Sequence, residues 1–212
     1  MDLFAKAGIR HTKGSRAASA AADQVLSEQD FANAWAEITA WDGYAATPLI
    51  DLSTLASTLT VSKILYKHEG PRFGLGSFKA LGGSYAAQRV LQRQISAQLG
   101  LEVSLEDIRT GKYKSEAAQI TLVSATDGNH GRSVAWGAQL FACQCLIYIH
   151  RDVSPGRETA IQAYGAKVIR VKGNYDDSVR QAALDAEAFG RIVVSDTSYA
   201  GYMEIPKFVA LG

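Results

Sequence analysis

The second half of the chain alternates short apolar segments with longer amphipathic stretches, and this alternation restricts the fold more than any other feature. The apolar segments, rich in β-branched residues, are 120–124, 145–149, 167–171 and 191–195. Stretches with a helical pattern lie between them, at 131–140, 156–164 and 175–189. Buried strands that alternate with helices form right-handed βαβ units and hence a parallel sheet. We therefore predict an α/β fold with a small parallel four-stranded sheet and flanking helices.

Size, charge and hydropathy exclude several classes of protein. With 212 residues, of which 47% are hydrophobic, the chain can bury a substantial core, and most of it is too apolar to be disordered. Its formal net charge of +1 gives no electrostatic footprint for nucleic acid. No apolar run approaches the roughly 20 residues of a membrane-spanning helix. We expect no nucleic-acid or membrane partner, and a cytoplasmic location.

Neither the cysteines nor the histidines have the spacing of a metal site. Cys143 and Cys145 flank a single glutamine in an apolar segment, which is a poor pattern for a disulfide or for zinc. We interpret them as buried thiols in a reducing compartment. His68 and His150 have no metal-ligand spacing to a neighbour, so we assign them no role. The sequence predicts no metal site.

The N-terminal part of the chain has fewer regular patterns. Residues 1–26 are basic and rich in alanine and serine, which predicts a flexible N-terminal arm, although the composition also resembles a transit peptide. Ser27 and Asp30 have the spacing of a capping box, which predicts a helix to about residue 38. Residues 63–67 have the β-branched and aromatic content of a short strand.

Lys79 lies just inside a predicted long helix, 77–99, that follows a glycine-rich loop at 70–76. The positive end of the helix dipole disfavours a charged ammonium there, and imine formation or proton transfer requires the neutral amine. The loop lacks the third glycine of a dinucleotide-binding fingerprint. An ordinary surface lysine remains the alternative. Small residues in the early turns of the helix, including Gly82 and Gly83, permit close approach of another backbone or of a flat ligand.

A second polar loop, Ser-Ala-Thr-Asp-Gly-Asn-His-Gly at 124–131, follows the first strand of the predicted sheet. Ligands of parallel sheets bind beyond the carboxyl ends of the strands, and amide groups at a helix N-terminus bind carboxylates or phosphates. Asp127 could cap the next helix or act as an acid or base beside a substrate. Asp196, after the fourth strand, is predicted to point into the same crevice; alternatively, it caps a helix starting near Tyr199.

Taken together, these segments resemble the pyridoxal-phosphate (PLP) enzymes of the tryptophan synthase β-like fold, called fold type II, and among them the diaminopropionate ammonia-lyases. The resemblance rests on Arg-Phe-Gly-Leu-Gly-Ser-Phe-Lys-Ala-Leu-Gly-Gly at 72–83 and on the loop at 124–131, and it extends from about Thr47 to the end. Serine and threonine dehydratases share Ser-Phe-Lys, but they usually have an arginine two residues after the lysine and no aspartate before Gly-Asn. The resemblance implies PLP as the cofactor and a small amino acid as the substrate.

The resemblance also implies roles for individual residues. Lys79, next to Phe78 in the cofactor site, would form the covalent link to PLP, and Asn129 would hydrogen-bond the oxygen on the cofactor's ring. Lys79 would also remove the α-proton of an L substrate, and Asp127 that of the D isomer. Asp196 would recognise the distal ammonium group of the substrate.

Further residues of the loop at 124–131 are implied in substrate binding. The loop amides from Ala125 through Thr126 and Asp127 to Gly128 would hold the substrate carboxylate. His130 is a further candidate for a substrate contact, or only a support of the loop.

Members of the family that the chain resembles are considerably longer, and the loop that binds the PLP phosphate comes from their C-terminal half. We therefore predict a truncated fold type II enzyme in which a small α/β domain, 86–198, is complete and a larger α/β domain is incomplete. Residues 27–85 would be the N-terminal part of the large domain, with the Schiff-base lysine, and 199–212 the return into it. A homodimer is expected for the full-length protein.

The function implied is α,β-elimination of D- and L-2,3-diaminopropionate to pyruvate and ammonia, by this chain or by an enzyme of which it is the N-terminal fragment. One alternative is a dehydratase of the serine/threonine type, since the elimination chemistry is shared. An alternative of another class is a catalytically silent, truncated domain that acts through its open interface.

Overall fold

The computed structural model describes residues 25–212, so the predicted N-terminal arm lies outside the described residues except for its last two positions. Four parallel strands form the central sheet: β3 (Thr121–Ala125), β4 (Gln144–His150), β5 (Lys167–Val171) and β6 (Ile192–Val193). Their order across the sheet is β5-β4-β3-β6. The predicted α/β class and parallel four-stranded sheet are confirmed, although the fourth strand is shorter than expected.

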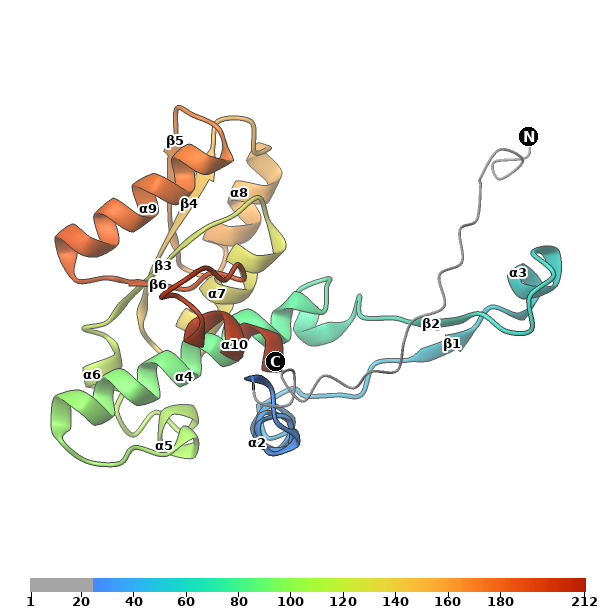
Figure 1. Cartoon of the computed structure of the whole chain (residues 1–212), viewed down its shortest axis with the longest axis horizontal. Helices are drawn as coiled ribbons and strands as arrows, with labels where there is room; N and C mark the ends of the chain where they lie inside the picture. Colours follow the sequence, from blue (N-terminus) through green and yellow to red (C-terminus); the bar gives the residue numbers. More distant parts are fainter. Residues whose placement is uncertain (1–24) are drawn as a thin grey trace.

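Helices cover both faces of this sheet (Figure 1). On one face lie α7 (Asn129–Leu140) and α8 (Pro155–Gln162), and α9 (Tyr175–Phe189) packs on the other. The side chain of Asn174 caps the start of α9, and the helix ends at Gly190, whose φ of 63° is a left-handed conformation that glycine adopts readily. The helices therefore bury the apolar faces of the strands, as their alternation along the sequence predicts.

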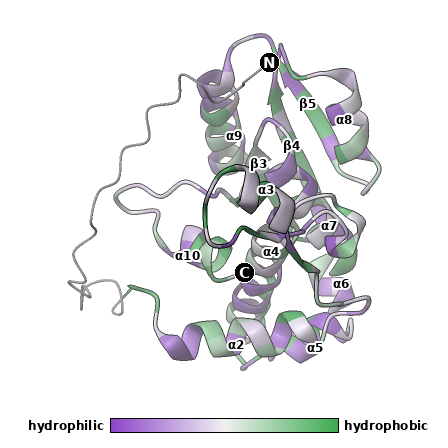
Figure 2. Ribbon diagram, turned by 90° about the vertical axis from the view of Figure 1, so that its right-hand side faces the viewer, coloured by the Kyte–Doolittle hydropathy of each residue, from purple (hydrophilic) through white to green (hydrophobic). Residues whose placement is uncertain are grey.

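A further layer of helices packs around α4 (Lys79–Leu99), which lies against α7. α10 (Glu204–Leu211) and α2 (Glu28–Thr39) also contact α4, and the short helices α5 (Leu105–Arg109) and α6 (Lys114–Ala117) follow it in the chain. In Figure 2 the strands β4 and β5 are coloured largely as hydrophobic, whereas the helices around them carry both kinds of residue. The larger core lies between the sheet, α7 and α4.

Two local expectations from the N-terminal part can be compared with the structure. Ser27 and Asp30 form the predicted capping box at the start of α2. The glycine-rich segment at 70–76 is not wholly irregular, because η1 (Arg72–Gly74) makes one 3-10 turn. Within this turn Phe73 has a φ of 48°, which is a left-handed conformation unusual for a residue with a side chain.

An antiparallel hairpin projects from the body of the molecule (Figure 1). It consists of β1 (Leu49–Asp51) and β2 (Leu65–Lys67), with α3 (Ser53–Thr58) at its tip. The strand predicted at 63–67 is thus shorter, and β1 was not predicted. Every residue of both strands is exposed. Because an isolated two-stranded ribbon is marginally stable in water, this apolar surface is suited to contact another part of a larger assembly.

Helices α4 and α7 approach so closely that their backbones meet at small residues. The Ser84 N–H donates to the Ser133 Oγ over 3.1 Å, and the Ser84 Oγ donates to the Ser133 carbonyl over 2.9 Å. A Cβ on Gly83 would lie 2.5 Å from the Ser133 Oγ, and one on Gly137 would lie 2.8 Å from the Ser84 Cα. The small residues early in α4 were predicted to allow close approach of another backbone or of a flat ligand, and the structure shows the backbone of α7 there. This crossing brings Lys79 toward the start of α7.

The cysteines are free thiols, as their spacing predicts. Burial raises the pKa of Cys143 to about 12 and also raises the pKa of Cys145. Neither thiol is therefore a reactive thiolate at neutral pH. Among the helices of residues 25–212, none combines the length and the apolar character that crossing a membrane requires.

We expect Gly137→Ala to destabilise the protein by about 1–3 kcal/mol, because the added methyl group has to displace the backbone of Ser84 in a closely packed crossing. Equilibrium unfolding in urea measures this difference. Gly156→Ala in α8 is the matched control: a Cβ there meets nothing within 4 Å, so this variant should match or exceed the wild type, by up to about 1 kcal/mol. A Gly137→Ala variant as stable as the wild type would contradict the packing described.

Candidate active site

A cavity of about 360 Å³ opens at the carboxyl edge of the sheet, beside the starts of α4 and α7. It is lined by Lys79, Ala125, Thr126, Asp127, Gly128, Asn129, His130, Arg157, Tyr175 and Asp196. Every residue predicted from the sequence to form the site lies on this cavity except Phe78, which is 63% exposed. Arg157 and Tyr175 were not predicted.

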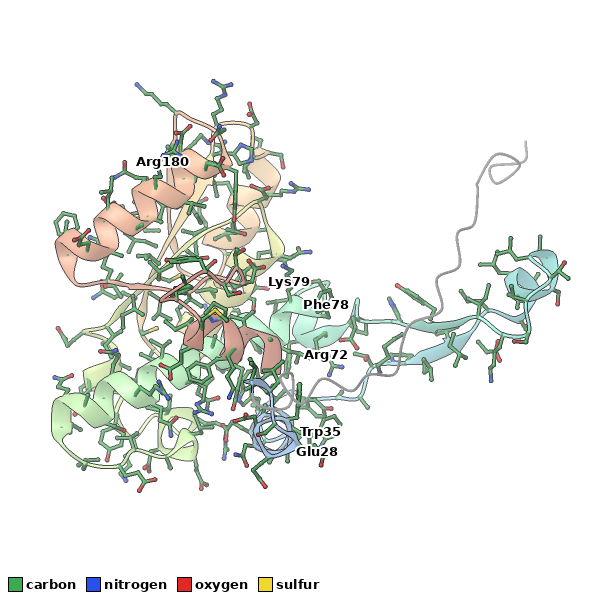
Figure 3. All side chains as sticks on the ribbon, viewed as in Figure 1. Glu28, Trp35, Arg72, Phe78, Lys79 and Arg180 are labelled. Atoms are coloured by element: carbon green, nitrogen blue, oxygen red, sulfur yellow. The ribbon has the colours of Figure 1, made fainter. Side chains whose placement is uncertain are left out.

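Lys79 and Asp196 form an ion pair across the cavity. Lys79 is the first residue of α4, where Figure 3 labels it beside Phe78, and Asp196 follows β6. The Lys79 Nζ lies 2.5 Å from the Asp196 Oδ2, and the two side chains are 38% and 30% exposed. Asp196 is thus the carboxylate that Lys79 contacts at the start of α4.

The environment of Asp196 favours its ionised form. Burial acts to raise the pKa of this carboxyl group, but the hydrogen bond from Lys79 and the positive charge of Lys79 outweigh it, so the pKa is lowered from its usual 3.8. The alternative in which Asp196 caps a helix starting near Tyr199 is wrong. Tyr199 instead forms an isolated bridge with Tyr202, and the next helix, α10, begins later in the chain.

The loop before α7 is held in shape by hydrogen bonds to the side chain of Thr126. The Thr126 Oγ1 accepts hydrogen bonds from the N–H of Gly128 over 3.1 Å and from that of Gly131 over 3.2 Å. A Cβ on Gly131 would collide with the Thr126 side chain, so glycine is required there. Gly128 occupies the capping position of α7 without a side-chain hydrogen bond, so the alternative in which Asp127 caps this helix is wrong.

Asp127 is instead paired with His150, a histidine without a predicted role. The His150 Nε2 lies 3.0 Å from the Asp127 Oδ1, and the two side chains are 18% and 56% exposed. His150 is the last residue of β4, which lies next to β3 in the sheet. Its position at the carboxyl end of a predicted strand was the signal that could have identified it, since parallel strands end at one edge.

His130 is almost fully buried beneath the cavity, with 5% of its side chain exposed. Its Nε2 lies 3.0 Å from the Val194 carbonyl oxygen, and its Nδ1 lies 3.9 Å from the Asp196 carboxylate. Burial lowers the pKa of His130 from its usual 6.5, although Asp196 opposes this shift. The neutral imidazole therefore joins the first turn of α7 to the segment that leads to Asp196.

Arg157 and Tyr175 complete the polar wall of the cavity. The Arg157 guanidinium donates to the Asp127 carbonyl over 3.3 Å. Burial, together with the charges of Asp196, Asp127 and Asp176, raises the pKa of Tyr175. Both residues lie in the first turn of a helix that follows a strand of the parallel sheet, which was the sequence signal for their placement at this edge.

The lysine at the start of α4, the polar loop and the α/β fold together define a class of enzyme. The sequence profile of the family described as "Pyridoxal-phosphate dependent enzyme" matches residues 40–207. The chain therefore belongs to this family, whose cofactor is PLP.

Within the family, the chain is similar to the diaminopropionate ammonia-lyases, as predicted. It is 37% identical to the diaminopropionate ammonia-lyase of Salmonella typhimurium over 169 residues, which are 80% of this chain and 42% of that protein. The crystal structure of the Escherichia coli diaminopropionate ammonia lyase in apo form matches with a TM-score of 0.80 and 36% identity, over 88% of this chain and 50% of that one. A catabolic L-threonine dehydratase of Staphylococcus aureus is 26% identical over 62% of this chain and 31% of that protein. This chain thus spans half or less of the length of these relatives.

The buried His130 should make the stability of the protein depend on pH. Because its folded-state pKa is lowered, its contribution is complete above the usual value of 6.5 and is lost as the pH falls below that value. We expect the free energy of unfolding to fall more steeply between about pH 7.5 and 5.5 in the wild type than in His130→Gln, which cannot titrate. Urea unfolding at each pH gives both curves, and parallel curves would contradict this assignment.

Proposed function

We propose that this chain supplies part of the active site of a PLP-dependent ammonia-lyase that converts D- and L-2,3-diaminopropionate to pyruvate and ammonia. The observation that carries the proposal is a lysine and two carboxylates, Lys79, Asp127 and Asp196, on one cavity. The similarity to a diaminopropionate ammonia-lyase over 80% of the chain supports the substrate class. Because the chain spans 42% of that relative, other groups of the site would be supplied from outside these residues.

The cavity suits the aldehyde end of PLP. Its volume of about 360 Å³ lies within the range of small-molecule sites, roughly 300–1,000 Å³. The Lys79 side chain is 38% exposed, so its amine is accessible from the cavity. We propose that Lys79 holds the cofactor, that Asn129 hydrogen-bonds its ring oxygen and that Phe78 lies beside it. The phosphate would be bound elsewhere, since no glycine loop of the implied kind follows Gly131.

When bound, PLP withdraws electrons from the α-carbon of the substrate, which makes the α-proton removable and allows the β-amino group to leave. Lys79 would accept the α-proton of the L isomer. Asp127 would accept that of the D isomer from the other face, so that one site could serve both isomers. With one water, each diaminopropionate yields one pyruvate and two molecules of ammonia.

The loop before α7 would bind the substrate carboxylate. Its amides from Ala125 to Gly128 lie at the N-terminus of a helix, where backbone N–H groups and the dipole favour an anion. The two hydrogen bonds that Thr126 accepts fix the shape of this loop. A preformed loop loses little conformational freedom when a substrate binds.

Asp196 would bind the distal ammonium of the substrate. Its carboxylate already accepts a hydrogen bond from the Lys79 ammonium, and a substrate ammonium presents the same chemistry. When Lys79 turns to the cofactor, this carboxylate becomes available. His130 would support the site through its contact with the Val194 carbonyl, or would itself contact the substrate.

Two alternatives have specific support. The match to an L-threonine dehydratase at 26% identity favours elimination from a β-hydroxy amino acid, and pyruvate release from serine rather than from diaminopropionate would establish it. The exposed apolar strands of the hairpin favour a catalytically silent domain that acts through an open interface. A chain that binds no PLP, with or without Lys79, would support that second alternative.

We also propose the organisation of the complete enzyme. Residues 27–85 and 199–212 would belong to a large domain and 86–198 to a small one; α4 runs unbroken across the first boundary. A homodimer would cover the exposed apolar surface of the hairpin. The enzyme would be cytoplasmic, and its near-neutral charge supports the absence of a nucleic-acid partner.

Borohydride reduction of the PLP-loaded protein should attach the cofactor permanently to Lys79, because this amine lies on the cavity. Mass-spectrometric peptide mapping identifies the modified lysine. Lys79→Ala should carry no adduct, whereas Lys63→Ala, a change to a lysine of the exposed hairpin, should keep it. An adduct on a different lysine would exclude Lys79 as the cofactor's ligand.

In the holoenzyme that contains this chain, Asp127→Asn should lower pyruvate release from D-diaminopropionate about 100-fold or more, because it removes a general base. Release from the L isomer should change only a few-fold. Initial rates on each isomer measure the two effects. Equal loss on both isomers would refute the assignment of Asp127 to the D isomer.

A further inference from the structure

We propose that His150 is a positioning residue that orients the Asp127 carboxylate and keeps it ready to accept a proton. This inference rests on the proposed function, because it concerns the base for the D isomer. The observation behind it is the 3.0 Å contact between the His150 Nε2 and the Asp127 Oδ1. Asp127 follows β3 and His150 ends β4, so the pairing of these two neighbouring strands brings the residues together.

The hydrogen bond at the second ring nitrogen of His150, Nδ1, indicates the tautomer of the imidazole and therefore the direction of the contact with Asp127. The backbone N–H of Asp152 donates to the His150 Nδ1 over 3.2 Å, so Nδ1 is an acceptor and carries no proton. In the neutral imidazole the proton therefore resides on Nε2, and the Nε2–H donates to the Asp127 carboxylate. A fixed tautomer of this kind gives the hydrogen bond a defined direction.

The histidine is held more firmly than the carboxylate that it contacts. Its carbonyl and those of Arg151 and Val153 accept hydrogen bonds from the Arg170 guanidinium, over 3.3, 2.8 and 2.8 Å. Arg170 is in turn paired with Glu158 over 2.5 Å. These hydrogen bonds hold the backbone at the end of β4 in place. The His150 imidazole can therefore orient the Asp127 side chain, which lies on the more exposed loop.

This arrangement has a consequence for the reaction. The Asp127 side chain is 56% exposed and would otherwise be free to rotate into solvent. With its Oδ1 occupied by His150, its Oδ2 remains for the α-proton of the substrate. The charged groups around this pair are the Asp152 carboxylate, 3.7 Å from the His150 Nδ1, and the Arg157 guanidinium on the Asp127 carbonyl.

The hydrogen bond itself can be tested without catalysis. In the ¹⁵N-labelled chain at a pH where His150 is neutral, long-range ¹H–¹⁵N correlation spectra report which imidazole nitrogen carries the proton. We expect the Nε2-protonated tautomer for the signal that disappears in His150→Gln. The Nδ1-protonated tautomer would overturn the proposal, because His150 could not then donate to Asp127.

The effect on catalysis is tested with two variants of the holoenzyme. His150→Leu removes the donor and should lower kcat/KM for D-diaminopropionate about 10- to 100-fold more than for the L isomer. His150→Gln keeps a side-chain N–H donor and should restore most of the loss. His68→Leu, the same change at a histidine of the segment after β2, is the matched control and should leave the ratio of the two isomers unchanged.

The possible outcomes separate this inference from the proposed function. A wild-type enzyme that releases pyruvate from neither isomer refutes the proposed function, and the tautomer measurement then decides whether His150 donates to Asp127. An active enzyme in which His150→Leu lowers both isomers equally, without rescue by His150→Gln, shows a merely structural role and overturns the inference. An unchanged ratio of isomers in a folded His150→Leu variant overturns it as well.

Discussion

The contact between α4 and α7 is the constraint on which the candidate site depends. Two long helices can run this close together only where side chains are absent or very small, and Gly83, Gly137 and the hydrogen-bonded pair Ser84 and Ser133 meet that need. The crossing joins the layer around α4 to the parallel sheet. As a result, Lys79 at the start of one helix faces the loop at the start of the other, although the two lie far apart in the sequence.

The polar groups of the cavity are arranged as two separate pairs. Asp196 is matched with the Lys79 ammonium, and Asp127 with the His150 imidazole. The parallel sheet makes this possible, since its strands deliver Asp127, His150 and Asp196 to one edge.

Most of the fold could be predicted because the strands of a buried parallel sheet and the helices between them are local patterns. The strand Lys167–Val171 and the helix Tyr175–Phe189 lie where the sequence placed them. The strand Leu49–Asp51 was missed because its three residues are a strand only through pairing with Leu65–Lys67. Such a short segment has no periodicity of its own, and its partner lies beyond an intervening helix.

The α/β class, the glycine-rich loops and the residue types of the site can be read from the sequence, since each is encoded in a few consecutive positions. The resemblance to PLP enzymes is visible there as well, because the residues around Lys79 and Asp127 form continuous motifs. The partners of the site residues, in contrast, depend on the folded chain: Asp196 for Lys79, 117 residues away, and His150 for Asp127. Those contacts follow from the order of the strands and the crossing of α4 and α7, which no local pattern specifies.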